Sequence, residues 1–134
     1  MTEPRRVPGF PDYDQALAFH AALVERLPIE DPGPADEQKL RSALNRSQAA
    51  AQQGRADVVT IAAFLLFELI RSQAFGRGST QTGIALALAF LLRNGVSVNA
   101  SNEEIAGVGV GIARGEIYTG IVEQWLRESV RRIQ

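Results

Sequence analysis

Two stretches of this sequence are apolar on every side when they are placed on a helix, and a short glycine-rich loop joins them. The first runs from Val58 to Ile70 and the second from Ile84 to Leu92. A helix with this pattern has no face suited to water, so it belongs in the middle of a fold. The first stretch is too short to span a membrane and contains Glu68. The pattern predicts two buried central helices.

Four more helices are expected around this pair, which makes the fold class all-α, a compact bundle of about six helices. Asp12 or Asp14 can cap the first helix, and Ser101 with Glu104 forms a capping box before the fifth. Gly95 and Gly115 are typical residues for helix ends. The expected helices are Asp12–Leu27, Ala35–Gln52, Asp57–Ser72, Thr82–Asn94, Ser101–Gly115 and a last one from Ile117 or Tyr118 onward.

Three glycines interrupt the expected fifth helix, at positions 107, 109 and 111. Each costs a helix about 1 kcal/mol relative to alanine. Their alternation with apolar residues would also suit a strand, but an isolated strand has no partner here. We therefore expect a helix that approaches its neighbour closely at Gly107 and Gly111.

Length and composition fit one intracellular domain. The chain of 134 residues can bury a core of its own, and we assign residues 12–134 to a single helical domain. Residues 1–11 hold three prolines and should form a loose arm without an apolar leader. The absence of cysteine excludes disulfides, thiolate metal sites and a cysteine nucleophile, and it suits the cytoplasm, where we expect the protein.

The charge pattern says more than the net charge of −1, which gives no footprint for nucleic acid. No Asp or Glu lies between Glu68 and Glu103, whereas Arg71, Arg77 and Arg93 do. Burial explains a shortage of acids in apolar helices. The other interpretation is a centre that faces an anion.

The loop Gly76-Arg77-Gly78-Ser79-Thr80 is the one feature with the makings of a binding site. Small residues let backbone amides approach a ligand, and the following helix points its positive N-terminus at the loop. A phosphate could be held there. A short Gly/Ser turn between two helices is, however, common without any ligand.

Residues 73–95 (QAFGRGSTQTGIALALAFLLRNG) resemble the signature of the Fic/Doc family, closest to its Doc, or death-on-curing toxin, branch. The family pattern is His-x-Phe-x-(Asp/Glu/Asn)-(Gly/Ala)-Asn-(Lys/Gly)-Arg-Thr, followed by a long apolar helix. Leu27-Pro28, Asp31-Pro32-Gly33 and Gly115-Glu116-Ile117 are similar to other parts of Doc proteins. The resemblance implies an all-helical fold and transfer of a nucleotidyl or phosphoryl group to a protein hydroxyl.

The family's reactive positions hold other residues in this chain. The resemblance places Gln73 at the histidine that acts on the hydroxyl, Arg77 at the acid that holds Mg²⁺, Ser79 at the asparagine, Thr80 at the Doc lysine and Gln81 at the arginine. Only Phe75, Gly78 and Thr82 fit the pattern. Gln73 has no titratable nitrogen to accept a proton, and Arg77 cannot bind a cation. We call residues 73–82 the motif segment.

These substitutions predict a Doc-like domain without transferase activity, with no catalytic residue, metal or cofactor, that acts by binding. The candidate site for an anion or nucleotide phosphate is Gly76, Arg77, Gly78, Ser79, Thr80 and Thr82. By resemblance, an antitoxin-like protein is a possible partner; nucleic acid and membrane are not expected. The alternatives are a transferase with a rebuilt site and a structural or oligomerising helical module.

Two titratable side chains outside the motif segment also need an assignment. His20, the one histidine, is expected on the surface or half-buried on the first helix. Glu68 lies one turn before the motif segment and is expected to pair with Arg71 or another arginine. A functional role for either residue is the alternative.

Overall fold

Six α-helices and one small two-stranded antiparallel sheet make up the described part of the fold. The structure, a computed structural model, describes residues 7–29, 35–50 and 56–133. The predicted all-α class and the six helices are confirmed. In chain order the elements are α1 (Tyr13–Arg26), α2 (Glu37–Ala50), α3 (Val58–Arg71), the 3₁₀ helix η1 (Gly76–Gly78), α4 (Ser79–Arg93), β1 (Val96–Val98), α5 (Asn102–Ala113), α6 (Thr119–Ser129) and β2 (Val130–Arg132).

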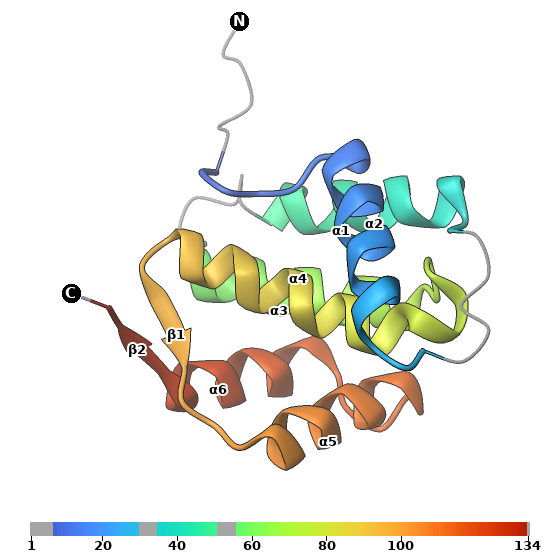
Figure 1. Ribbon diagram of the computed structural model, residues 1–134. Helices are drawn as coiled ribbons and strands as arrows, with labels where there is room; N and C mark the ends of the chain where they lie inside the picture. The colour runs from blue at the N-terminus through green and yellow to red at the C-terminus, as the bar shows by residue number, and fades with distance from the viewer. Residues whose placement is uncertain (1–6, 30–34, 51–55, 134) are drawn as a thin grey trace, which may run out of the picture.

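The helices form three layers with α3 and α4 in the middle. Figure 1 shows α1 and α2 on one side of this pair and α5 and α6 on the other, with the two-stranded sheet β1–β2 at one end. The most extensive helix–helix packing is between α3 and α4, as their apolar sequences predict. The motif segment therefore lies at one end of the central pair and the β1–β2 sheet at the other.

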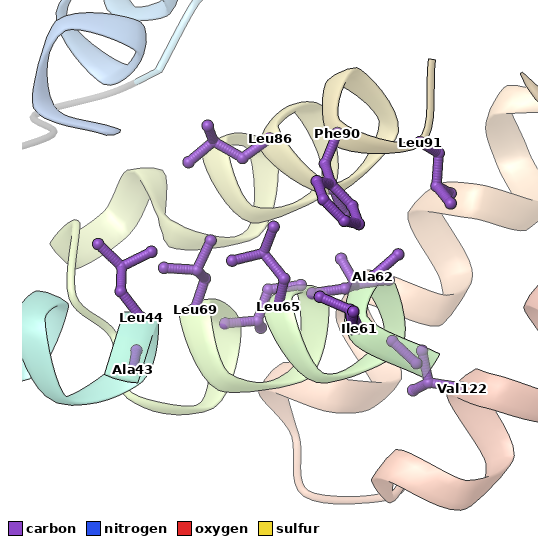
Figure 2. Packing of buried hydrophobic residues seen from close by; sticks show 14 of the residues in the cluster. Ala43, Leu44, Ile61, Ala62, Leu65, Leu69, Leu86, Phe90, Leu91 and Val122 are labelled. Carbon is purple, nitrogen blue, oxygen red and sulfur yellow. The ribbon is translucent and has the colours of Figure 1, made fainter. Parts of the chain in front are cut away.

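The core is built mainly by α3 and α4. Figure 2 shows Leu86 and Phe90 of α4 facing Leu65 and Leu69 of α3. Burial of side chains of this size is the main favourable contribution to folding, about 1.5–3 kcal/mol each. The prediction that α4 is buried on every side is wrong for Leu92, whose side chain is 54% exposed. The reason is that no described helix covers this part of α4.

Polar side chains fix the helix N-termini. Asp12 caps α1 in a capping box with Gln15, and Asp57 caps α3 by accepting from the amide of Thr60. Arg127 of α6 also donates to Asp57, and this hydrogen bond is the main reason that the pKa of Asp57 falls to about 2. The interaction ties α6 to the beginning of α3.

The predicted capping box of α5 is only half formed. The side chain of Ser101 accepts a hydrogen bond from the amide of Glu104, as predicted. The carboxylate of Glu104 instead accepts from the indole N–H of Trp125 on α6, at 2.8 Å. A tertiary contact has replaced the local one.

The close approaches along α5 occur at Gly109 and Gly111, so the prediction for Gly107 is wrong. A Cβ at Gly109 would lie 2.8 Å from Thr80 Cγ2, and one at Gly111 would clash with Ile117. A Cβ at Gly107 would meet nothing within 4 Å. Gly109 is thus the glycine at which α5 packs on α4, and Gly111 packs against Ile117, which follows α5 in the chain.

The two-stranded sheet was not predicted. β1 pairs antiparallel with β2, with Val96 opposite Arg132. Strands of three residues are too short for alternation to be recognised in the sequence. Gly95, with φ at 76°, turns the chain from α4 into β1.

Residues 7–11 of the predicted arm pack against α4. Phe10 contacts Phe90 edge-on at 6.0 Å between ring centroids, and Asn94 donates to the carbonyl of Pro8. Residues 1–6 lie outside the described residues. None of the described helices has the length and apolarity required to cross a membrane.

Candidate functional site

The motif segment is a tight turn that runs directly into α4. The chain leaves α3 at Ser72, passes through η1 and enters α4 at Ser79, three residues earlier than predicted. Ser79 and Thr82 are consequently helical and buried, with side chains at most 1% exposed. The loop available to a ligand is shorter than the sequence indicated.

Gln73 adopts a left-handed backbone conformation, with φ at 56°. This region is unfavourable for a residue with a Cβ. Its side-chain amide donates to the carbonyl of Ile70 at 2.7 Å and so helps to end α3. The residue at the family's histidine position thus has a structural role.

The polar groups of the turn are largely satisfied within it. The amides of Gly76, Gly78 and Ser79 donate to the carbonyls of Gln73, Phe75 and Gly76. The hydroxyl of Ser79 accepts from the amide of Phe75 at 3.0 Å. Four backbone amides that an anion could have used, those of Phe75, Gly76, Gly78 and Ser79, therefore already have acceptors.

His20 of α1 packs into the motif segment. Its Nδ1 lies 2.8 Å from Thr82 Oγ1, a buried hydrogen bond in which either atom can hold the proton. Its ring stacks on Phe75 with 4.5 Å between centroids. A Cβ at Gly78 would lie 3.0 Å from His20 Cε1, so the imidazole needs a glycine there. One side chain therefore contacts all three residues that fit the family pattern.

The prediction that His20 is a surface or half-buried residue is wrong, because its side chain is only 7% exposed. Burial lowers the pKa of His20 below 6.5, which favours the neutral imidazole. The available signal was its position: His20 lies three residues after Leu17 and four before Val24, within the apolar stripe of α1. A polar residue in such a stripe needs a buried partner.

Three other positions of the motif segment face water. Gln73, Arg77 and Gln81 are exposed, while Phe75, Gly78 and Thr82 are buried. The exposed residues stand at the family's histidine, acid and arginine positions. The three residues that fit the pattern are thus all buried, and the residues that differ from it are exposed at these three positions, while Ser79 differs and is buried.

Glu68 forms an ion pair with Arg46 of α2, at 2.7 Å, and not with Arg71 or Arg77. This confirms the predicted pairing with another arginine and points the carboxylate at α2, away from the motif segment. Within the described ranges, no three His, Asp or Glu side chains are grouped so that they could hold a metal ion.

Two hollows that share Phe19 lie along α1, and the smaller of them lies between α1 and α4. A hollow of about 190 Å³ is lined by Phe19, Ala22, Leu23 and Arg26. A smaller one of about 30 Å³ lies between Phe19, Ala89, Phe90 and Arg93, among others. Phe19 belongs to both, and an arginine lines each. We call this feature the α1–α4 groove. Nothing in the sequence indicates this groove, because the all-round apolarity of α4 predicts that the helix is covered on every side.

The chain is similar to one curated protein over most of its length. It is 34% identical over 119 residues to the protein named "Protein kinase doc" from Escherichia phage P1, a match that covers 85% of this chain and 90% of that protein. No protein-family model matches the chain.

Proposed function

The chain belongs to the Doc branch of the Fic/Doc family, and we propose that within it this protein is a binding domain that does not transfer phosphoryl or nucleotidyl groups. The name of the phage P1 relative describes it as a protein kinase. Because fold and sequence are shared along nearly the whole length, the proposal depends on the motif segment.

The observation that carries the proposal is the division of the motif segment into buried and exposed residues. The buried Phe75, Gly78 and Thr82 hold the turn together around His20. The exposed Gln73 and Arg77 cannot accept a proton or bind a metal cation, which phosphoryl transfer in this family requires by resemblance. The turn has been kept and its reactive groups have not.

The test compares the protein with a variant that restores the family residues. Purified protein is incubated with Mg²⁺, a bacterial extract as acceptor, and ATP or GTP labelled at the α or γ phosphate. We expect no protein labelling by the natural sequence and no growth arrest on expression. The restored variant carries Gln73→His, Arg77→Asp, Ser79→Asn, Thr80→Lys and Gln81→Arg, and the phage P1 protein is the positive control. Labelling by the natural chain that is lost on substituting Arg77 or Gln81 would contradict the proposal.

The partner that we propose is a helical segment of an antitoxin-like protein in the α1–α4 groove. The groove is apolar along Phe19 and Leu23 and has an arginine in each hollow, and α4 also carries the exposed apolar side chain of Leu92. An amphipathic helix binds such a surface through residues three and four apart. Arg26 and Arg93 favour acidic residues near both ends of the bound segment.

This part is tested by co-purification with the product of the neighbouring reading frame. Leu92→Glu should abolish the complex, and Arg26→Glu with Arg93→Glu should weaken it. Ile121→Glu is the matched control, because Ile121 on α6 is 53% exposed against 54% for Leu92. Equal binding by all variants, or loss with Ile121→Glu alone, would place the partner elsewhere.

A second candidate function is weak, metal-independent anion binding at Gly76–Thr82. Arg77 supports it, because a guanidinium can pair with phosphate oxygens and this one is exposed. The satisfied amides of Gly76, Gly78 and Ser79 leave few further donors, so we expect millimolar affinity that falls with salt. Phosphate, sulfate and ATP titrations followed at the amides of residues 76–82 test it. Arg77→Ala should remove the shifts and Arg93→Ala should not; amides unmoved in the natural sequence would rule the site out.

A further inference from the structure

A pocket of about 560 Å³ lies at the end of the central helix pair that carries the β1–β2 sheet, opposite the motif segment. Its apolar lining includes Val58 and Ile61 from the first turn of α3, Val96 of β1, and Val7. Arg132 of β2 and Asn94 also line it. The volume is within the range of small-molecule sites, about 300–1,000 Å³. We call it the sheet pocket.

Two of its polar groups already have partners. The carboxylate of Asp57, also in the lining, is held by Arg127 at 2.9 Å and by the amide of Thr60. The side-chain amide of Asn94 donates to the carbonyls of Pro8 and Phe90, at 2.8 and 2.9 Å. Neither group needs a ligand to complete its hydrogen bonds.

Arg132 is different, since it takes part in none of the ion pairs between described residues. Its position opposite Val96 in the two-stranded sheet places it in the pocket lining. Arg131 is not part of that lining, because successive residues of a strand point to opposite faces. The pocket thus combines apolar side chains with a guanidinium that forms no ion pair with a described residue.

We propose that the sheet pocket binds a small amphipathic monoanion, with its apolar body against Ile61 and Val96 and its carboxylate at Arg132. Apolar contact area supplies most of the affinity. The guanidinium pairs with the carboxylate and sets the orientation. This site is independent of the motif segment and of the function proposed above.

The test uses octanoate as the probe and 1-octanol as its uncharged counterpart. Methyl NMR spectra of the full chain are recorded during both titrations, with Ile61 and Val96 as reporters. Octanoate should give saturable shifts at these methyl groups, and octanol should bind several-fold more weakly. Arg132→Gln should weaken octanoate several-fold and leave octanol unchanged, whereas Arg131→Gln should change neither.

Three results would overturn the proposal. They are shifts at Ile61 and Val96 that do not saturate, equal binding of octanoate and octanol, and equal loss with Arg131→Gln and Arg132→Gln. Both substitutions lie on the exposed strand β2, and the unfolding midpoint of each variant shows directly whether the fold is intact.

Discussion

His20 shows how one residue can hold a turn in place. It connects α1 to the motif segment through the hydroxyl of Thr82 and the ring of Phe75. Among the described side chains around it, those on α1 at Ala16, Leu17, Leu23 and Val24 are uncharged, and burial is the only cause of its lowered pKa. The imidazole therefore stabilises the fold only in its neutral form.

The first prediction concerns the pH dependence of stability. The pKa of His20 is lower in the folded than in the unfolded chain, where it is about 6.5. Stability should therefore be at its full value above pH 6.5 and decrease as the pH falls through the folded pKa. Because the chain has one histidine, an NMR titration of its imidazole measures this pKa directly. A value of 6.5 or higher would be inconsistent with a buried ring, and His20→Leu should remove this part of the pH dependence.

The second prediction concerns the backbone of Gln73. A residue with a Cβ at φ 56° costs about 1–2 kcal/mol, and glycine avoids this cost. Gln73→Gly loses the hydrogen bond to Ile70, so a net stabilisation of up to about 1 kcal/mol is expected. Urea unfolding measures it. Ser72→Gly is the control: Ser72 has an ordinary helical φ of −72°, so its replacement should destabilise the protein.

At the scale of elements, arginines at helix ends explain much of the carboxylate-free centre. Arg71 and Arg93 lie in the last turns of α3 and α4, and Arg114 is the C-cap of α5. A cation at that end is favoured by the helix dipole. The guanidinium of Arg71 also lies close to Gly115, just after the end of α5. The positive charge of this region is accounted for by helix ends, with Arg77 as the exception.

The third prediction separates the glycines of α5. Gly107→Ala should stabilise the protein by up to about 1 kcal/mol, because alanine favours a helix and nothing lies within 4 Å. Gly109→Ala should destabilise it, because the new methyl group would lie 2.8 Å from Thr80 and 2.9 Å from Ile84. Thermal unfolding of the two variants tests this. The same change in both would mean that α5 does not pack on α4 at Gly109.

For the whole molecule, the packing joins all three helix layers through α3. Leu40 of α2, Leu65 of α3 and Val122 of α6 are all buried in one cluster. Such a core should unfold as a unit. This is what the assignment of residues 12–134 to a single domain requires.

The fourth prediction is that the two sides of the molecule unfold together. Trp125, the one tryptophan, reports on α5 and α6 by fluorescence, and far-UV circular dichroism reports on all helices. Their denaturation curves should coincide. Leu126→Ala, a fully buried site on α6, should lower the stability by about 2–5 kcal/mol in both signals. Two separate transitions would show that α5 and α6 form an independent unit.

The sequence by itself determined the six helices and the family. Asp12, Asp57 and Ser101 marked helix starts, and all-round apolarity placed α3 and α4 at the centre, because caps and periodicity act within a few residues of the chain. The same held for the motif segment, whose resemblance to Doc proteins depends on residue order alone. For the helices the errors in position lay at the ends, such as the start of α4, where an early 3₁₀ turn merges with the helix, and the two short strands were missed.

Only the tertiary structure decided which distant groups meet. His20 and Thr82 are 62 residues apart, and Val96 pairs with Arg132 across most of the C-terminal half. Glu68 bonds to Arg46 on another helix although Arg71 is one turn away on its own. The position of each helix, and hence the partner of each side chain, is set by the burial of whole apolar faces. That sum over many contacts leaves no mark at any single position in the sequence.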